Sequence, residues 1–284
     1  MDRDNKPQTV KDFLQWAVSF LGAEKRIEAE LLLAETLGYS RAKLLAYQEE
    51  LLAEEKQERF QDLINRRKSG EPLQYLLGKQ NFMGLDFLVN KNVLIPRSDT
   101  EVLVEETIKL AKEIAKPLSI LDLCTGSGAI AVSLAKYLPD ASFCAVDISG
   151  DALEVAKINA VNAGVLEKIE FFHGDLYAPL TKQSFEIIVS NPPYISTGEM
   201  EQLPLDVKKE PALALWGGED GLDFYRRILE EAPKYLKTNG YILLEIGWQQ
   251  GETVLNLLKD NNFVNRKIIK DWAGNVRVVK GQLT

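Results

Sequence analysis

The tetrapeptide Asn191-Pro192-Pro193-Tyr194 combines residue types that can hold a flat amine group. Asn191 has an amide oxygen that accepts hydrogen bonds, and the carbonyl of Pro192 is a second acceptor on a stiff backbone. Two acceptors that point the same way suit a planar NH2 group, and the ring of Tyr194 can stack on its plane. The other interpretation is a proline-rich turn in which Asn191 is only a turn residue.

The residues before this tetrapeptide place it in a fold. Residues 185–190 include a β-branched apolar run, which predicts a buried parallel strand. The two prolines cannot continue a central strand, so the chain must leave the sheet at Asn191. Because ligands of open parallel sheets bind beyond the carboxyl ends of the strands, Asn191 is expected at a ligand site.

A second candidate segment is a glycine turn between a predicted strand and a predicted helix. Its two glycines allow the backbone to approach a ligand closely and expose the N–H groups of the helix start. Asp147 ends the next predicted strand, where a carboxylate can accept both hydroxyls of a ribose. The residues of this turn are Cys124, Thr125, Gly126, Ser127 and Gly128.

The same turn is compatible with more than one ligand. Gly126, Gly128 and Ala131 satisfy the spacing of the dinucleotide fingerprint, so a nicotinamide cofactor competes with other nucleosides. A tight turn that binds no ligand is the third interpretation. The glycines alone do not decide between these possibilities.

Three further carboxyl-end positions are candidates. Asp122 can face the cationic end of a ligand or cap the following helix, and these alternatives stay open. Asp175 can receive an adenine amino group while Leu176 packs on its ring, or Asp175 can be a turn residue. His173 is interpreted as a strand residue and not as a catalyst.

The repeated order of strand, glycine turn and helix predicts a doubly wound α/β sheet. The predicted strands are residues 119–123, 142–147, 169–173, 185–190 and 240–246, followed by a hairpin of 264–269 and 277–280. The helices between them are predicted at residues 129–138, 151–163, 222–236 and 249–258.

The N-terminal part has a different pattern. Apolar residues recur at helical spacing in residues 10–21, 25–37, 40–47 and 53–68, which predicts a small helical bundle, with Thr9 as the first N-cap. Residues 71–97 predict a β-hairpin linker. Ser98 or Asp99 is expected to cap the next helix, and Arg97 is interpreted as a surface residue instead of a carboxylate partner.

Composition excludes several classes of protein. The net charge of −8 disfavours a protein that coats nucleic-acid phosphates, so no DNA partner is expected. Two cysteines and one histidine predict neither a disulfide framework nor a metal site, and a reducing, cytoplasmic setting is expected. Residues 1–6 do not read as a signal peptide, and no apolar run reaches membrane-spanning length.

Several of these motifs together resemble a known family. The turn at 122–128, Asp147 and Asn191-Pro-Pro-Tyr194 resemble the class I S-adenosylmethionine-dependent methyltransferases that act on planar nitrogens. Further segments resemble the release factor glutamine methyltransferases, the PrmC/HemK family. These segments are residues 70–78, 94–101, 210–213, 217–222 and 244–247, and the resemblance extends over about residues 13–280.

The resemblance implies a complete set of assignments. The fold would be a Rossmann-like methyltransferase sheet in residues 98–284, with a helical domain in 1–70 that helps hold the release factor. The reaction would transfer a methyl group from S-adenosylmethionine to the glutamine amide nitrogen of the Gly-Gly-Gln motif of class-1 peptide chain release factors. The implied site residues are Asn191 and Pro192 for catalysis; Asn191, Pro192, Pro193 and Tyr194 for the glutamine; and Cys124, Thr125, Gly126, Ser127, Gly128, Asp147, Ile148, Asp175, Leu176 and Asn191 for the cofactor.

One position departs from the family pattern, because Cys124 stands where the family usually has glycine. This difference puts the backbone conformation at the turn in question. Other functions also remain as alternatives: a glutamine methyltransferase that acts on a ribosomal protein, an adenine-N6 nucleic-acid methyltransferase, an NAD enzyme, or a non-catalytic module that binds a nucleotide or docks on a translation factor.

Overall fold

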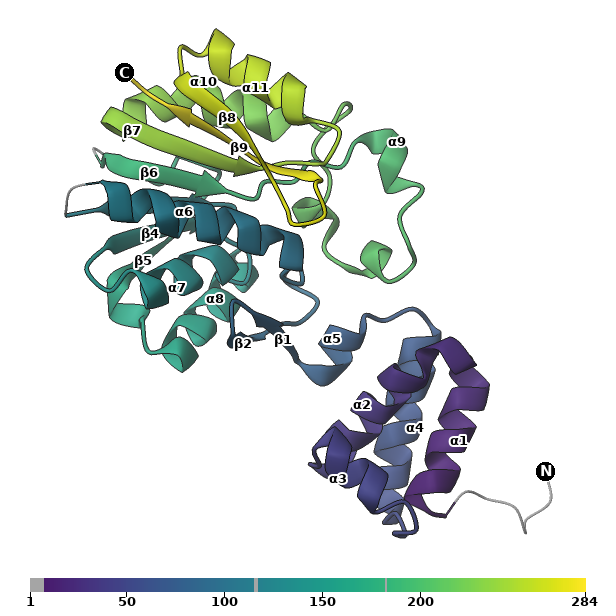
Figure 1. Ribbon diagram of the computed structural model, residues 1–284. Coiled ribbons are helices and arrows are strands. Elements are labelled where there is room, and N and C mark those ends of the chain that lie inside the picture. The colour runs from purple at the N-terminus through teal and green to yellow at the C-terminus, as the bar shows by residue number, and fades with distance from the viewer. Residues whose placement is uncertain (1–7, 115–116, 182) are drawn as a thin grey trace. The chain divides into compact units, whose positions relative to one another are not determined.

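A computed structural model of the protein describes residues 8–114, 117–181 and 183–284. Residues 1–6, in which no signal peptide is expected, lie outside the described residues. The chain divides into a helical unit, which ends at Gly78 and also contains Leu205–Lys209, and a sheet unit of Lys79–Pro204 and Glu210–Thr284 (Figure 1). None of the described helices is both long enough and apolar enough to cross a lipid bilayer.

The helical unit is a small bundle with its own apolar core. Phe13, Leu32 and Phe60 are fully buried in that core. Thr9 forms the predicted N-cap, since its hydroxyl accepts from the N–H of Asp12 at 3.2 Å and Asp12 accepts from the N–H of Thr9 at 3.1 Å. The helices are α1 (Val10–Leu21), α2 (Arg26–Leu37), α3 (Arg41–Ala46), α4 (Glu54–Lys68) and α5 (Leu73–Leu77), with a 3-10 turn at Ala23–Lys25.

The sheet unit begins with the predicted hairpin. Strands β1 (Lys79–Phe82) and β2 (Leu85–Leu88) pair antiparallel around a turn at Met83 and Gly84. Phe82 and Phe87 pack edge to face and are both buried. The hairpin is shorter than residues 71–97, since Leu73–Leu77 is helical and belongs to the other unit.

The main sheet has seven strands in the order β5-β4-β3-β6-β7-β9-β8. The first five strands of this order are parallel, and β9 and β8 add an antiparallel hairpin at one edge. This confirms the predicted Rossmann-like sheet. The strands are β3 (Ser119–Leu123), β4 (Ser142–Asp147), β5 (Ile169–His173), β6 (Phe185–Ser190), β7 (Leu236–Glu245), β8 (Val264–Lys270) and β9 (Val276–Gln282).

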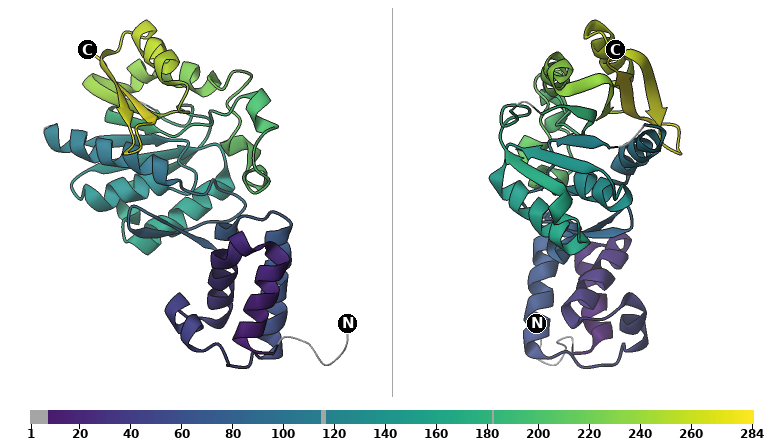
Figure 2. Two further views of the ribbon diagram at one scale, coloured as in Figure 1. Left: turned by 45° about the vertical axis from the view of Figure 1, so that its right-hand side comes forward. Right: turned by 90° about the vertical axis from the view of Figure 1, so that its left-hand side faces the viewer.

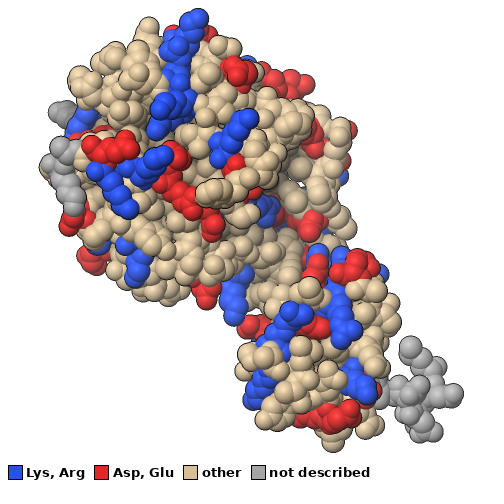
Figure 3. All heavy atoms as spheres, viewed as in Figure 1, with Lys and Arg blue, Asp and Glu red and all other residues tan. Residues whose placement is uncertain are grey.

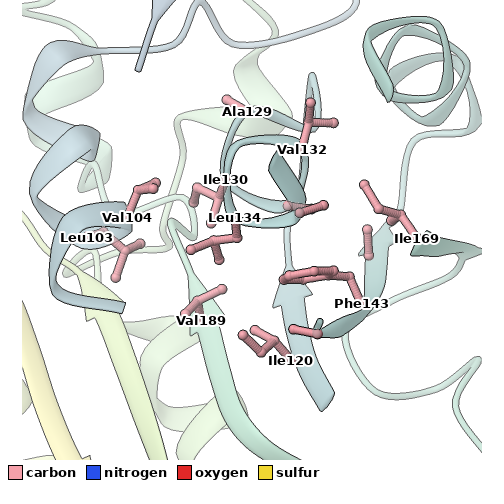
Figure 4. Close-up of a cluster of buried hydrophobic side chains, with 14 of the residues drawn as sticks. Leu103, Val104, Ile120, Ala129, Ile130, Val132, Leu134, Phe143, Ile169 and Val189 are labelled. Carbon is pink, nitrogen blue, oxygen red and sulfur yellow. The ribbon is translucent and has the colours of Figure 1, made fainter. Parts of the chain in front are cut away.

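Helices cover both faces of the sheet because alternate strand residues point to opposite sides. Leu103, Ile120 and Val189 belong to the core under α6, α7 and α8, and Figure 4 shows these side chains pointing toward one another. Leu121 and Ile188 belong to the second core, under α10 and α11. Figure 2 gives two further views of these layers. The helices are α6 (Glu101–Glu113), α7 (Ala129–Tyr137), α8 (Gly150–Ala163), α9 (Thr197–Met200), α10 (Asp223–Tyr235) and α11 (Gly251–Asp260).

Shorter 3-10 turns join several of these elements. They are Ser98–Thr100, Leu166–Lys168, Val207–Lys209 and Ala212–Ala214. The turn at Ser98–Thr100 overturns the predicted cap of α6, because neither Ser98 nor Asp99 caps it and Thr100 occupies the N-cap position. The carboxylate of Asp99 instead forms an ion pair with Arg277 at 2.9 Å.

Candidate active site

The candidate site lies where the sheet order reverses, between β3 and β6. Leu123 and Ser190 are paired across these strands, and the Ser190 hydroxyl donates to the carbonyl of Leu123 at 2.7 Å. The residues that follow, Cys124 and Asn191, therefore leave the sheet side by side. The structure thus brings the glycine turn and the proline-rich segment to one edge.

The glycine turn needs its two glycines for different reasons. Gly126 has a φ of +57°, and a Cβ at this position would meet open space, so only backbone faces the pocket here. Gly128 has a φ of +79°, and a Cβ there would lie 3.1 Å from the Cβ of Ala156 on α8. Cys124 also adopts a left-handed φ, +59°, which is the conformation that favours glycine.

Asp147 binds the glycine turn with one oxygen and the start of α8 with the other. Its Oδ2 accepts from the N–H of Gly126 at 2.8 Å, and its Oδ1 accepts from the N–H of Ser149 at 2.9 Å. Burial raises the pKa of Asp147, although these hydrogen bonds oppose the rise. Each carboxylate oxygen has a further lone pair, so the side chain can still accept two hydroxyl groups.

A pocket opens between these segments. Eight of the residues predicted from the sequence line it: Cys124, Gly126, Asp147, Ile148, Asp175, Leu176, Asn191 and Pro193. Sequence reasoning missed several others, which come from the segment after the hairpin, the start of α8, the loop after α9, and α10. They are Asn92, Val93, Leu94, Ser149, Ala152, Gly174, Pro211, Leu213, Ala214, Phe224 and Arg227, and Val146 completes the lining.

The other predicted residues lie behind this lining. Thr125 and Ser127 are buried, and Gly128 packs on α8. Pro192 is buried, and Tyr194 is partly buried against the second core. Among the missed residues, Leu94 and Leu213 could have been selected from the sequence, because they are apolar residues within the segments that carry the family resemblance.

Asp122 is almost completely buried and incompletely hydrogen-bonded. Its Oδ2 accepts from the Thr125 hydroxyl at 2.6 Å and from the N–H of Ala131 at 3.2 Å. The bond from Ala131 corresponds to the alternative in which Asp122 caps the following helix. Its Oδ1 has no hydrogen-bond partner among the described residues. Burial raises the pKa of Asp122 to about 7, against the effect of these hydrogen bonds. The free oxygen leaves the ligand-facing alternative open as well.

Asp175, which also lines the pocket, has an ion-pair partner that the sequence did not indicate. Its Oδ2 accepts from the guanidinium of Arg227 on α10 at 2.5 Å. This ion pair leaves one carboxylate oxygen for a ligand. His173 ends β5, and its Nε2 lies 2.9 Å from the carbonyl of Ile148, in accord with its interpretation as a strand residue.

The backbone of the proline-rich segment is held by a glycine loop. A Cβ on Gly217 would lie 2.7 Å from the Pro193 carbonyl, and one on Gly221 would lie 2.4 Å from the Tyr194 carbonyl, so these contacts require glycine. Gln250 strengthens the arrangement, because its Nε2 donates to the carbonyls of Tyr194 and Gly221 at 3.0 and 3.2 Å. The segment 217–221 therefore serves as a backbone support.

Asn191 directs its two amide atoms differently. Its Nδ2 donates to the Thr100 hydroxyl at 3.3 Å. The hydrogen bonds among the described residues leave Oδ1 of Asn191 and the carbonyl oxygen of Pro192 without a donor. These are the two acceptors that the sequence predicted for an NH2 group.

The interpretation of Arg97 as a surface residue is wrong. Its Nη2 donates to Oε1 of Glu210, a carboxylate that is 5% exposed. Glu210 also accepts from the N–H of Ile95 at 3.0 Å. The pair fixes the start of the loop that supplies Pro211, Leu213 and Ala214 to the pocket. The buried carboxylate of Glu210 therefore has a structural role.

No group of three or more His, Cys, Asp or Glu side chains suited to a metal ion occurs in the part of the chain that the structure describes. Cys124 and Cys144 are both free thiols. Burial raises the pKa of each, to about 11 for Cys144, so neither is an activated nucleophile.

Comparison with known proteins decides the family. A family described as PrmC N-terminal domain matches residues 12–78, and one described as Methyltransferase small domain matches residues 99–205. A release factor glutamine methyltransferase from Geobacter sulfurreducens is 43% identical over 98% of this chain and 99% of its own. The chain belongs to the release factor glutamine methyltransferase family. A second member, from Moorella thermoacetica, is 46% identical over 90% of this chain and 91% of its own.

A solved structure agrees with the methyltransferase fold of this release factor glutamine methyltransferase family member. A methyltransferase from Pyrococcus furiosus has a TM-score of 0.51 and 19% identity, covering 81% of this chain and 98% of its own. At that identity the likeness shows the methyltransferase fold and no more.

The pocket also fits S-adenosylmethionine, the cofactor of such methyltransferases. Asp147 offers lone pairs to the two ribose hydroxyls, and Ile148 and Leu176 offer apolar surface to a flat base. Gly126 allows close backbone approach, because a Cβ at this position would meet open space. The donor and acceptor set therefore matches the chemistry of this cofactor.

Proposed function

We propose that the protein transfers a methyl group from S-adenosylmethionine to the side-chain amide nitrogen (N5) of the glutamine in the Gly-Gly-Gln motif of class-1 peptide chain release factors. Membership of the family supports this proposal, since the curated relatives bear the corresponding name. One structural observation carries it: two acceptor oxygens, Asn191 Oδ1 and the Pro192 carbonyl, have no donor among the described residues, and Asn191 and Pro193 line the cofactor pocket.

The chemistry that the chain must supply follows from the substrate. An amide nitrogen is a poor nucleophile because its lone pair is delocalised into the carbonyl. Hydrogen bonds from both N–H groups of the glutamine to Asn191 Oδ1 and to the Pro192 carbonyl draw electron density onto the nitrogen and aim it. Catalysis is then mainly orientation and electrostatic preorganisation.

When bound, S-adenosylmethionine supplies a methyl group that is already activated by its attachment to a sulfonium. Cys124, Thr125, Gly126, Ser127, Gly128, Asp147, Ile148, Asp175 and Leu176 are proposed to hold it. Methylation makes the remaining N–H protons of the substrate more acidic, and the two acceptor oxygens hold these protons until one passes to water. Tyr194 and Pro193 are proposed to border the flat carboxamide.

The helical unit is proposed to hold the release factor, and its exposed apolar side chains support this role. Tyr47 and Leu51 are 54% and 68% exposed, and Lys43 lies over the ring of Tyr39 at 3.6 Å. Such side chains can anchor a protein surface. The variant Tyr47→Ala should raise KM for an intact release factor and leave methylation of a short Gly-Gly-Gln peptide unchanged.

The deciding experiment offers alternative methyl acceptors. The protein is incubated with labelled S-adenosylmethionine and a release factor, a glutamine-containing ribosomal protein, or DNA. Label is expected in the Gly-Gly-Gln peptide of the release factor alone. Preferential labelling of the ribosomal protein or of DNA adenine would replace the proposal with one of those activities, and labelling of none would remove it.

The charge distribution bears on the nucleic-acid alternative. On the face seen in Figure 3, Lys and Arg side chains of the sheet unit alternate with Asp and Glu. A nucleic-acid methyltransferase needs a basic groove that follows the phosphates. A reducing cytoplasmic setting, where release factors act, remains part of the proposal and is compatible with two free thiols.

A further inference from the structure

A buried carboxylate lies directly beside Asn191. Glu245 ends β7, and the pairing of Ser190 with Leu244 places Glu245 next to Asn191 across the two strands. Glu245 is only 3% exposed, and its Oε2 has no hydrogen-bond partner among the described residues. Burying a carboxylate oxygen without a hydrogen-bond partner costs free energy of folding. Its position beside the proposed substrate-binding amide therefore calls for a functional explanation.

Thr100 connects this carboxylate to Asn191. It occupies the N-cap position of α6, yet its hydroxyl makes no capping hydrogen bond. The hydroxyl instead accepts from Nδ2 of Asn191 at 3.3 Å, and hydrogen bonding by the side chains of Thr100 and Asn191 opposes the rise in the pKa of Glu245, so both side chains lie close to its carboxylate. The hydroxyl of Thr100 therefore does not cap the helix, although threonine is a favoured N-cap residue, and it faces Asn191 instead.

We propose that Glu245, together with Thr100, is a positioning residue that fixes the Asn191 amide with its NH2 toward the protein and its Oδ1 toward the substrate. This inference rests on the proposed function. An ionised carboxylate can only accept hydrogen bonds, so the group that faces it must be a donor. Asn191 then uses both N–H bonds on Glu245 and Thr100, and its oxygen is the only amide atom left for the glutamine.

Protonation of Glu245 would weaken this control. Burial raises its pKa to about 7, and the groups that face it are Asp99 before α6, Arg277 on β9, Thr100 and Asn191; Asp99 acts in the same direction as burial, while the other three oppose the rise. The hydroxyls of Tyr194 and Tyr225 also lie near enough to interact with its charge. A protonated Glu245 can donate, so the opposite orientation of the Asn191 amide is no longer excluded.

The test compares kcat for the release factor in wild-type protein and in Glu245→Gln at pH 6 and pH 8.5. Glutamine has the shape of the protonated acid and cannot ionise. The variant should therefore match wild type within about threefold at pH 6 and fall behind by roughly 10- to 100-fold at pH 8.5. Cofactor affinity, measured by calorimetry, should be unchanged. Comparing the two proteins at each pH cancels the titration of other groups, including Asp122.

Two further pairs of variants make the outcome decisive. Thr100→Val should lower kcat at pH 8.5 by roughly tenfold while Thr100→Ser restores it, and Glu245 itself is present in both variants. Glu186→Gln is the matched control, because Glu186 lies at the other end of the strand that leads to Asn191 and binds the N–H of Ser119 at 2.7 Å. It should leave kcat unchanged at both pH values.

The results separate this inference from the proposed function. If Glu245→Gln and Thr100→Val keep wild-type kcat at pH 8.5 while Asn191→Ala is inactive, the positioning role is wrong and the methyl transfer stands. A loss in Glu245→Gln that is equal at pH 6 and pH 8.5 also overturns it, since that result indicates a structural role. If wild-type protein does not methylate a release factor, the proposed function itself fails.

Discussion

A buried carboxylate of the helical unit and two buried carboxylates at the candidate site of the sheet unit have opposite environments. In the helical unit, Glu30 lies 3.0 Å from Arg26 and 2.7 Å from Arg41. Burial works against its ionisation, but these guanidinium groups hold the pKa of Glu30 below its ordinary value. In the sheet unit, burial outweighs the hydrogen bonds that Asp122 and Glu245 accept, and it raises the pKa of each to about 7.

The difference shows what each unit is built for. The helical unit satisfies its buried charges, as a small bundle must if it is to be stable. The sheet unit leaves one oxygen of Asp122 and one of Glu245 without a partner, and both lie at the carboxyl edge of the strands. Unused hydrogen-bonding capacity is typical of a site that binds a ligand or orients a reacting group.

The largest effect on methyl transfer is expected at Asn191, whose Oδ1 has no hydrogen-bond donor among the described residues. Asn191→Ala should lower methyl transfer by about 10³-fold or more, because it removes one of two oxygens that orient the substrate nitrogen. Cofactor affinity and the free energy of unfolding should change little. Transfer of labelled methyl groups, calorimetry and urea unfolding measure the three quantities, and wild-type turnover in this variant would remove the two-acceptor mechanism.

The second largest effect is expected in the pH dependence of the free energy of unfolding, which should differ between the carboxylates of the two units. The folded-state pKa of Asp122 and that of Glu245 are raised above the unfolded values, so the stability that each contributes is complete below about pH 4 and is lost as the pH rises through about 7. The full loss is roughly 3–4 kcal/mol for each group, and about 2 kcal/mol of it falls between pH 5.5 and pH 8.5. Urea unfolding at pH 5.5 and pH 8.5 should show a smaller decrease in Asp122→Asn and in Glu245→Gln than in wild type; equal decreases would mean that these carboxylates do not titrate as inferred.

Asp147 is a partly buried carboxylate that accepts one hydrogen bond on each oxygen. Asp147→Ala should weaken S-adenosylmethionine binding by roughly 10- to 100-fold, or about 1–3 kcal/mol, because the ribose loses its acceptor and the N–H of Gly126 loses its partner. Asp147→Asn, which keeps one acceptor oxygen, should weaken it less. Calorimetry that finds unchanged affinity in the alanine variant would exclude the ribose assignment.

The smallest effect is expected in the helical unit. Glu30→Ala should lower the free energy of unfolding by about 1–2 kcal/mol, since Arg26 and Arg41 are 61% and 48% exposed and regain solvent when their partner is removed. Methylation of a short Gly-Gly-Gln peptide should stay at the wild-type rate. A loss of peptide methylation in this variant would break the division of roles between the two units.

Much of the fold follows from local patterns in the sequence. The periodicity of apolar residues and the Thr9 cap predict α1 closely, and the strand and glycine-turn repeat predicts β3 to β6 within a residue or two. β7 starts four residues earlier than expected, because Leu236 already pairs with Phe185. The register is irregular between this pair and Tyr241, and Asn239 has a left-handed φ of +64° within that irregularity. The cap at Ser98 or Asp99 fails because Asp99 is taken by Arg277, a residue distant in the sequence.

The sequence by itself predicted the glycine turn, the two acceptors at Asn191 and Pro192, and the family resemblance, because each of these depends on residues that are close together in the chain. The tertiary structure decided what surrounds them. Thr100, Asn191 and Glu245 come from three separate elements, and only the pairing of β6 with β7 brings the carboxylate beside the amide. Such neighbours are fixed by strand order and register, which depend on packing over the whole sheet and not on local spacing.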